Sequence, residues 1–217
     1  TINTGTIALG AAGDGTNSPL GTIAGGTTVN TGAVLNVNGI TLSTSEPLAL
    51  NGTGIAAAGA LINGSATLSA DYSGLITLES ASSIVATTAA RELNITNPGT
   101  IVGAGFGLTL GGAGIGTISS IIGTGTGTLT KIGTGTWTLS SANTFSGGTT
   151  LSAGVLNINH TQALGAVGGT FTITAGTINN TSGSSISTLN YPMAWNGSFT
   201  FTGSNDLNLG TGAITLG

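Results

Sequence analysis

The sequence predicts an all-β fold, a right-handed parallel β-solenoid that forms one continuous domain over residues 1–217. Forty of the 217 residues are Gly, and each Gly inside a helix costs up to ~1 kcal/mol relative to Ala, so helices are disfavoured almost everywhere. Charged residues make up 4% of the chain, against roughly a quarter in ordinary soluble domains. Together with a sequence repeat, these observations favour stacked short strands over a mixed globular domain.

Short segments rich in Thr, Ile, Leu and Val are separated by Gly, Asn and Ser, which is typical of strands and turns. In chain order we expect strands at 6–9, 27–29, 34–37, 75–78, 93–96, 108–110, 129–132, 136–139, 149–151, 156–158, 171–173, 199–201 and 214–216. No stretch between them predicts a helix.

An internal repeat decides between a β-sandwich and a solenoid. Residues 25–38 return as residues 147–159 with one deletion, and residues 3–10 resemble residues 210–217. A solenoid of roughly 20 residues per coil would have about ten coils. Its narrow lumen should exclude large side chains and should hold stacked rows of apolar residues, among them Leu129, Leu139, Leu151, Leu156 and Ile158.

The second repeat-like segment, residues 129–159, carries a recognisable motif: Leu and Lys131, spaced glycines, a Thr-Trp-Thr-Leu-Ser strand, Asn143 two residues before Phe145, then Gly-Gly-Thr-Thr. It resembles the passenger-associated transport repeat, also called the autotransporter-associated β-strand repeat. Trp137 stands where Leu is usual, and Phe145 where Tyr is usual. The resemblance implies a right-handed parallel β-helix in a very large bacterial surface or secreted protein, often a type V autotransporter passenger. It implies no activity.

The charges predict neither a catalytic nor a nucleic-acid site. The net charge is −4, with two basic residues, so phosphate neutralisation is excluded. A carbohydrate-active enzyme would need clustered carboxylates, and only Asp71 and Glu79 are close enough in sequence to meet through a favourable turn. We therefore expect isolated, solvated charges, with Lys131 facing solvent and discouraging lateral strand pairing. The acidic residues are Asp14, Glu46, Asp71, Glu79, Glu92 and Asp206.

No metal or cofactor site is predicted. His160 is the single His and there is no Cys, so neither a His-based metal site nor a Ser-His-Asp triad can be assembled. We interpret His160 as a turn residue after a strand. We interpret residues 14–17 and 111–114 as turns, because neither has the repeated Asp spacing of a calcium loop.

Two surface features suggest alternative ligands. Spaced Thr residues at 124–128, 134–138 and 170–174 would order water if they formed a flat array, but their spacing does not match a single coil length, which favours plain β-propensity. The aromatic residues Tyr191, Trp195, Phe199 and Phe201 could stack on sugars, although a loop that plugs the last coils is the simpler interpretation.

The sequence thus predicts a non-enzymatic structural or adhesive segment of a bacterial cell-surface or secreted protein, with no catalytic, cofactor or metal residues. The alternatives are a carbohydrate-active β-helix enzyme and an ice- or glycan-binding module. Expected partners are surface glycans, neighbouring repeats of the same protein, or further copies stacked end to end into filaments. The last expectation rests on the similar terminal segments and on strand edges that carry no blocking charges or prolines.

Overall fold

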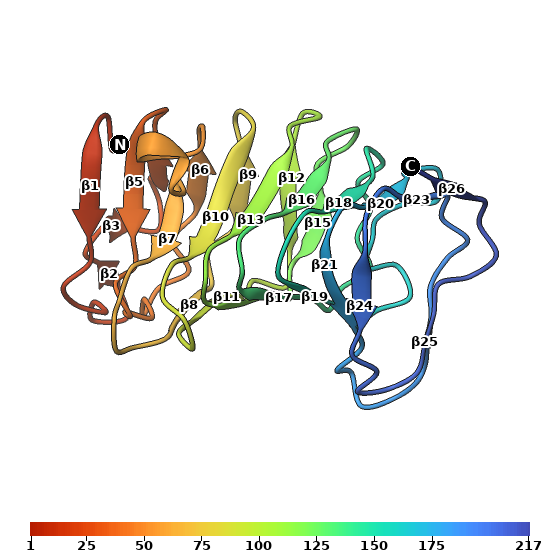
Figure 1. Ribbon diagram of the computed structural model, residues 1–217. Helices are drawn as coiled ribbons and strands as arrows, with labels where there is room; N and C mark the ends of the chain where they lie inside the picture. The colour runs from red at the N-terminus through yellow and green to blue at the C-terminus, as the bar shows by residue number, and fades with distance from the viewer.

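The computed structural model describes residues 1–217 and confirms a parallel β-solenoid. Figure 1 shows the coils stacked along one axis, with β1 at the N-terminal end and β26 at the opposite end. Three parallel sheets of ten, seven and five strands run along this axis. No helix is long and apolar enough to cross a membrane; the single helical element is the 3₁₀ turn η1 (Ile55–Ala57).

The ten-stranded sheet spans nearly the whole chain, whereas the other two sheets cover parts of it. In spatial order the first sheet comprises β1 (Gly5–Ala8), β5 (Ala33–Asn36), β7 (Leu61–Asn63), β10 (Ser82–Ala86), β13 (Leu108–Gly111), β16 (Leu129–Lys131), β18 (Thr149–Leu151), β20 (Phe171–Ile173), β23 (Met193–Trp195) and β26 (Ile214–Leu216). The seven-stranded sheet comprises β8 (Ala70–Tyr72), β11 (Glu92–Ile95), β14 (Ile115–Ile118), β17 (Thr136–Leu139), β19 (Val155–Ile158), β21 (Gly176–Asn179) and β24 (Phe199–Phe201).

The five-stranded sheet comprises β4 (Thr27–Val29), β6 (Leu48–Leu50), β9 (Ile76–Leu78), β12 (Thr100–Gly103) and β15 (Ile121–Gly123). Two small sheets complete the fold: the antiparallel hairpin of β2 (Asn17–Ser18) and β3 (Gly21–Thr22), and the parallel pair of β22 (Ile186–Ser187) and β25 (Leu207–Asn208). Every segment predicted from the sequence overlaps one of these strands.

Apolar side chains line the interior in rows, as predicted. Leu139 pairs in register with Ile118 and Ile158, and Leu156 pairs with Trp137. The five residues predicted for these rows, Leu129, Leu139, Leu151, Leu156 and Ile158, are at most 1% exposed. They belong to one core cluster of 38 buried residues, so burial of apolar surface along the axis is the main favourable contribution to the fold.

The expectation that the lumen excludes large side chains is wrong. Trp137, Tyr72, Phe145, Phe171 and Tyr191 are all buried. Glycines make the room: a Cβ on Gly116, the register partner of Trp137, would lie 2.5 Å from the indole ring. The interior is therefore close-packed by matching large residues to glycines on neighbouring coils.

The two copies of the sequence repeat form the same local structure on different faces. Residues 25–38 form β4, a turn and β5, which passes from the five-stranded to the ten-stranded sheet; residues 147–159 form β18, a turn and β19, which passes from the ten-stranded to the seven-stranded sheet. Both turns contain a glycine with positive φ, Gly32 at 79° and Gly154 at 69°. The repeat thus specifies a corner between two strands, not one face of the solenoid.

Candidate functional site

The motif region, residues 129–158, contains buried polar groups that hydrogen-bond to neighbouring coils. The first of these groups, Lys131, contradicts the prediction that it lies on the surface. Lys131 is 0% exposed and does not face solvent. It occupies an interior row between Leu110 and Leu151. Its Nζ donates to the carbonyl oxygens of Ile132 at 2.8 Å, Gly133 at 2.9 Å and Ala153, in the next coil, at 3.0 Å.

All three protons of the Lys131 ammonium are therefore used inside the protein. Burial nevertheless lowers the pKa of Lys131 to about 8, because the charged form has left water. The surface interpretation failed because the alternation of β16 places position 131 inside, and only the corner carbonyls make a charge there tolerable.

Trp137 and Asn143 make similar contacts. The Trp137 indole Nε1 donates to the Gly111 carbonyl oxygen of the preceding coil at 3.0 Å. The Asn143 Oδ1 accepts from the Ile122 amide of the preceding coil at 2.8 Å, while its Nδ2 donates to the Ala163 carbonyl oxygen of the following coil at 2.7 Å. Asn143 is buried, so it links three successive coils.

Phe145 and Thr149 complete this group. Phe145 is 0% exposed, and a Cβ on Gly165 would lie 2.9 Å from its ring. The Thr149 hydroxyl, also buried, donates to the Leu164 carbonyl oxygen at 3.0 Å. We call Lys131, Trp137, Asn143, Phe145 and Thr149 the coil-linking cluster. Since polar groups inside a protein are costly unless they are paired, this cluster fixes how consecutive coils stack.

Glu46 contradicts the expectation that the charges are solvated. It is 0% exposed; its Oε1 accepts from the Thr27 hydroxyl at 3.2 Å, and its Oε2 has no partner. The Tyr72 hydroxyl donates to the Glu46 carbonyl oxygen at 2.7 Å. Burial, and then the adjacent Glu46 carboxylate, raise the pKa of Tyr72 well above its usual range. Glu46 is a single acidic residue, and nothing in the sequence around it indicates that its side chain is buried.

The structure brings Asp71 close to Glu92, not to Glu79. The Asn94 amide nitrogen donates to Asp71 Oδ1 at 3.0 Å and to Glu92 Oε2 at 3.1 Å on the outer face of the seven-stranded sheet. Because one amide holds both carboxylates, the pair is an anchored surface contact. Asp14, Glu79, Glu92 and Asp206 are exposed, as predicted. No three His, Cys, Asp or Glu residues are grouped to hold a metal ion.

The remaining predicted features have mixed outcomes. His160 follows β19 in a turn, as predicted, and its Nδ1 accepts from the Gln162 amide at 3.0 Å. Asp14 caps the turn at residues 14–17, and hydrogen bonds from the Asn17 and Thr16 amides lower its pKa. The prediction that the aromatic residues near the C-terminal end form a plugging loop is wrong. Trp195 lies on β23 and Phe199 on β24, with their rings edge to face at 5.2 Å between centroids.

The spaced Thr sets do not form one outer surface, because Thr124 is fully buried. The register instead aligns a different column on the ten-stranded sheet. Its members, on β13, β16, β18 and β20, are Thr109, Thr130, Thr150 and Thr172. Sequence spacing could not reveal this column, since the coils differ in length.

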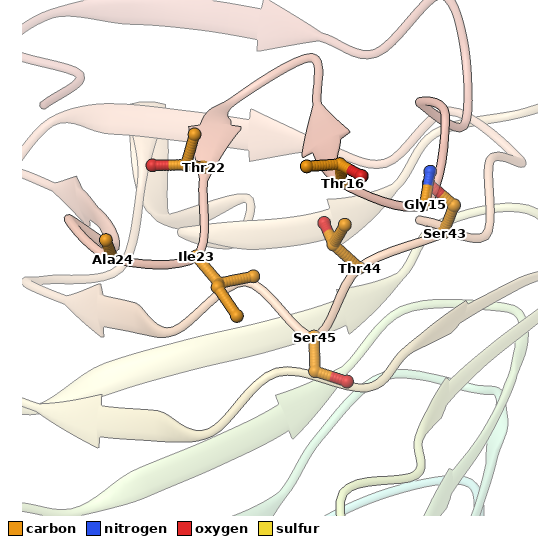
Figure 2. Close-up of a pocket in the computed structure, with 8 residues that line it drawn as sticks. All are labelled: Gly15, Thr16, Thr22, Ile23, Ala24, Ser43, Thr44 and Ser45. Atoms are coloured by element: carbon orange, nitrogen blue, oxygen red, sulfur yellow. The ribbon is translucent and has the colours of Figure 1, made fainter.

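A pocket of about 520 Å³ lies near the N-terminal end, between the hairpin β2–β3 and residues 43–45 (Figure 2). Its lining consists of Gly15–Thr16, Thr22–Ala24 and Ser43–Ser45. The Ser43 hydroxyl accepts from the Gly15 amide at 3.0 Å and donates to the Ala12 carbonyl oxygen at 2.9 Å, which fixes the two walls to each other. Nothing in the sequence indicates this pocket, because its polar residues are ordinary Thr and Ser in turns and in a short hairpin.

Stacked parallel coils held by buried side chains define the chain as a parallel β-solenoid of linked repeats. Residues 129–158 match the passenger-associated transport repeat family, so the chain carries one such repeat and the resemblance seen in its sequence is confirmed. The chain is also 33% identical over 90 residues to the adhesin BmaC autotransporter of Brucella suis biovar 1 (strain 1330). This match covers 42% of the chain and 3% of that protein. No solved structure matches.

Proposed function

We propose that the chain is a non-enzymatic structural and adhesive segment of a large bacterial surface or secreted protein, a part of a β-solenoid passenger. The observation that carries this proposal is the coil-linking cluster inside the matched repeat. Lys131 and Asn143 use their polar atoms on neighbouring coils, so the motif serves the continuity of the rod. The adhesin named above supports the adhesive part of the proposal.

A polysaccharide-cleaving activity is the alternative, and the Asp71–Asn94–Glu92 contact is where it would reside. We expect no turnover in a screen of plant, fungal and bacterial polysaccharides by reducing-end release. Turnover that is abolished by Asp71→Asn or Glu92→Gln, with Glu79→Gln as the control on the exposed surface, would contradict the non-enzymatic role. Display of the chain on the surface of a bacterium, followed by adhesion to host-cell or glycan surfaces, tests the adhesive role.

Head-to-tail stacking is the more specific part of the proposal. The outermost strands of the ten-stranded sheet are β1 and β26, and all their residues are exposed. Ile7 pairs with Leu35 at one end of the ten-stranded sheet, and Leu216 pairs with Trp195 at the other end. All four residues occupy positions of one interior row of side chains. A second copy, or another coil of the same protein, that pairs β1 with β26 would place Ile7 beside Leu216 and extend this row.

Electron microscopy of the concentrated chain tests the stacking. We expect thin rods that lengthen with concentration and show a repeat of ~4.8 Å along their axis. Leu216→Lys should shorten the rods, because it places a charge in the contact, whereas Thr150→Lys on the outer face should not. Isolated particles at all concentrations would contradict stacking between copies.

A further inference from the structure

The pocket beneath the β2–β3 hairpin has no assigned ligand, and its lining specifies one chemically. Its size lies within the ~300–1,000 Å³ typical of small-molecule sites. Five of the eight lining residues are Thr or Ser, and none is charged or aromatic. A hydroxyl both donates and accepts hydrogen bonds, so this lining matches a neutral ligand that itself carries hydroxyls. A charged ligand would be desolvated without a counter-charge.

Thr44 supplies independent evidence for a ligand. It is only 8% exposed, and its Oγ1 has no hydrogen-bond partner. Figure 2 shows the Thr44 side chain directed toward Thr16 across the pocket. A buried hydroxyl without a partner is unfavourable. Thr44 Oγ1 is shielded from solvent, so a ligand hydroxyl would supply the missing contact once the Thr44 side chain turns its hydroxyl toward the pocket.

The pocket also has an apolar side. Ile23 is 55% exposed and, together with Ala24, lines the pocket opposite Thr44. A pyranose ring has C–H groups on one face and hydroxyls at its edge, which fits Ile23 on one side and Thr44 on the other. Aromatic residues, which often serve this purpose, are replaced here by an aliphatic residue.

The walls are held in place without a ligand. The Asp14 carboxylate accepts from the Thr16 amide at 2.9 Å and from the Asn17 amide at 2.7 Å. The Ser18 hydroxyl accepts from the Leu20 amide at 3.0 Å within the hairpin. Ser45 contacts Ser73 of the next coil, with 3.2 Å between their hydroxyl oxygens. Such preorganisation lowers the entropy lost on binding.

We propose that this pocket binds one ring of a neutral saccharide, with Thr44 at the hydroxyl edge and Ile23 against the apolar face. The inference rests on the proposed adhesive function and names the ligand class that one surface of the segment would recognise. Small neutral molecules that lack the several hydroxyls of a sugar ring, including a ring with a single hydroxyl, are excluded by the proposal and serve as outcomes of the test.

The test uses the full chain and NMR titration with methyl α-D-glucoside, methyl α-D-mannoside and methyl β-D-galactoside, with a sialylated glycoside and cyclohexanol as comparisons. We expect shifts at Thr16, Ile23 and Thr44 with at least one neutral glycoside. Thr44→Val should weaken that binding about three- to ten-fold. The same change should raise the melting temperature, because it removes an unpartnered hydroxyl from the interior. Opposite effects on binding and stability separate a ligand contact from a structural one.

Thr150→Val is the matched control, since it makes the same change on the outer face of β18 and should alter neither binding nor shifts at the pocket. Equal binding by Thr44→Val, shifts confined to another surface, or equal binding of cyclohexanol would overturn the proposal. If no sugar shifts these signals while the chain adheres through another face, the pocket proposal fails and the proposed adhesive function stands. Cleavage of a polysaccharide would instead contradict the proposed function.

Discussion

Lys131 and Gly154 lie on adjacent coils, and the absence of a side chain on Gly154 makes room for the Lys131 ammonium. A Cβ on Gly154 would lie 2.7 Å from Lys131 Nζ, which is bound to the Ala153 carbonyl oxygen next to it. The lysine and the glycine of the motif are therefore two halves of one contact between coils.

Lys131→Met should destabilise the chain by about 2–4 kcal/mol, because three buried carbonyl groups lose their donor. Gly154→Ala should have a similar effect, since it displaces the ammonium and forces Ala to a φ of 69°. Urea unfolding followed by circular dichroism measures both. Thr130→Val, on the outer face of the same strand, is the control and should change the stability little. Full stability of Lys131→Met would show that the ammonium is not required.

Stability should also depend on pH through Lys131. Burial lowers the pKa of Lys131 to about 8 from 10.5 in the unfolded chain. Between these values the unfolded chain binds more protons, so the free energy of unfolding should rise with pH, by at most about 1.4 kcal/mol per pH unit. Urea unfolding from pH 7 to 9 measures the slope, because at most about a tenth of the Tyr side chains in the unfolded chain are ionised in this range.

Lys131→Met supplies the control for this slope, because it lacks the titrating group. The difference in stability between wild type and variant should therefore grow from pH 8 upward. Parallel profiles for the two proteins would contradict the assignment of the slope to Lys131.

Because Trp137 and Gly116 are register partners in contact, we expect the effects of substituting them on stability to be coupled. Gly116→Ala should destabilise the chain by about 1–3 kcal/mol, because the added Cβ would overlap the indole ring. Trp137→Leu should also destabilise it, by leaving a cavity and the Gly111 carbonyl without its donor. The double variant should be more stable than the sum of the single effects predicts. A double-mutant cycle by thermal unfolding measures this, and strict additivity would rule out the direct contact.

Glu46→Gln should stabilise the chain by about 1–3 kcal/mol, because it removes a buried charge that has no cationic partner while keeping an acceptor for Thr27. The change in melting temperature at pH 7 measures this effect. Glu79→Gln is the matched control on the exposed surface and should change little. A destabilised Glu46→Gln would mean that the carboxylate is held by contacts beyond the Thr27 hydroxyl.

Alternation and Gly-rich turns are local signals, and they located the core rows and thirteen of the 26 strands. The other thirteen strands were missed. Among them are β10, where Ser82 and Ser83 are buried although Ser has little strand preference, and β8, where Asp71 interrupts the apolar pattern. The positions of Lys131 and Glu46 could not be predicted, since the carbonyls and hydroxyl that hold them come from residues distant in sequence or from corner geometry. The pocket at Thr44 likewise requires a hairpin and a turn from two different coils.

If the matched repeat links each coil to its neighbours, Asn143→Ala should weaken one identifiable contact between coils, which amide hydrogen exchange can detect. The Ile122 amide, one coil earlier, donates to the Asn143 side chain. We expect this amide to lose protection selectively in the variant, while the Thr109 and Thr172 amides on the ten-stranded sheet keep theirs. Unchanged protection at Ile122 would show that Asn143 does not link the two coils.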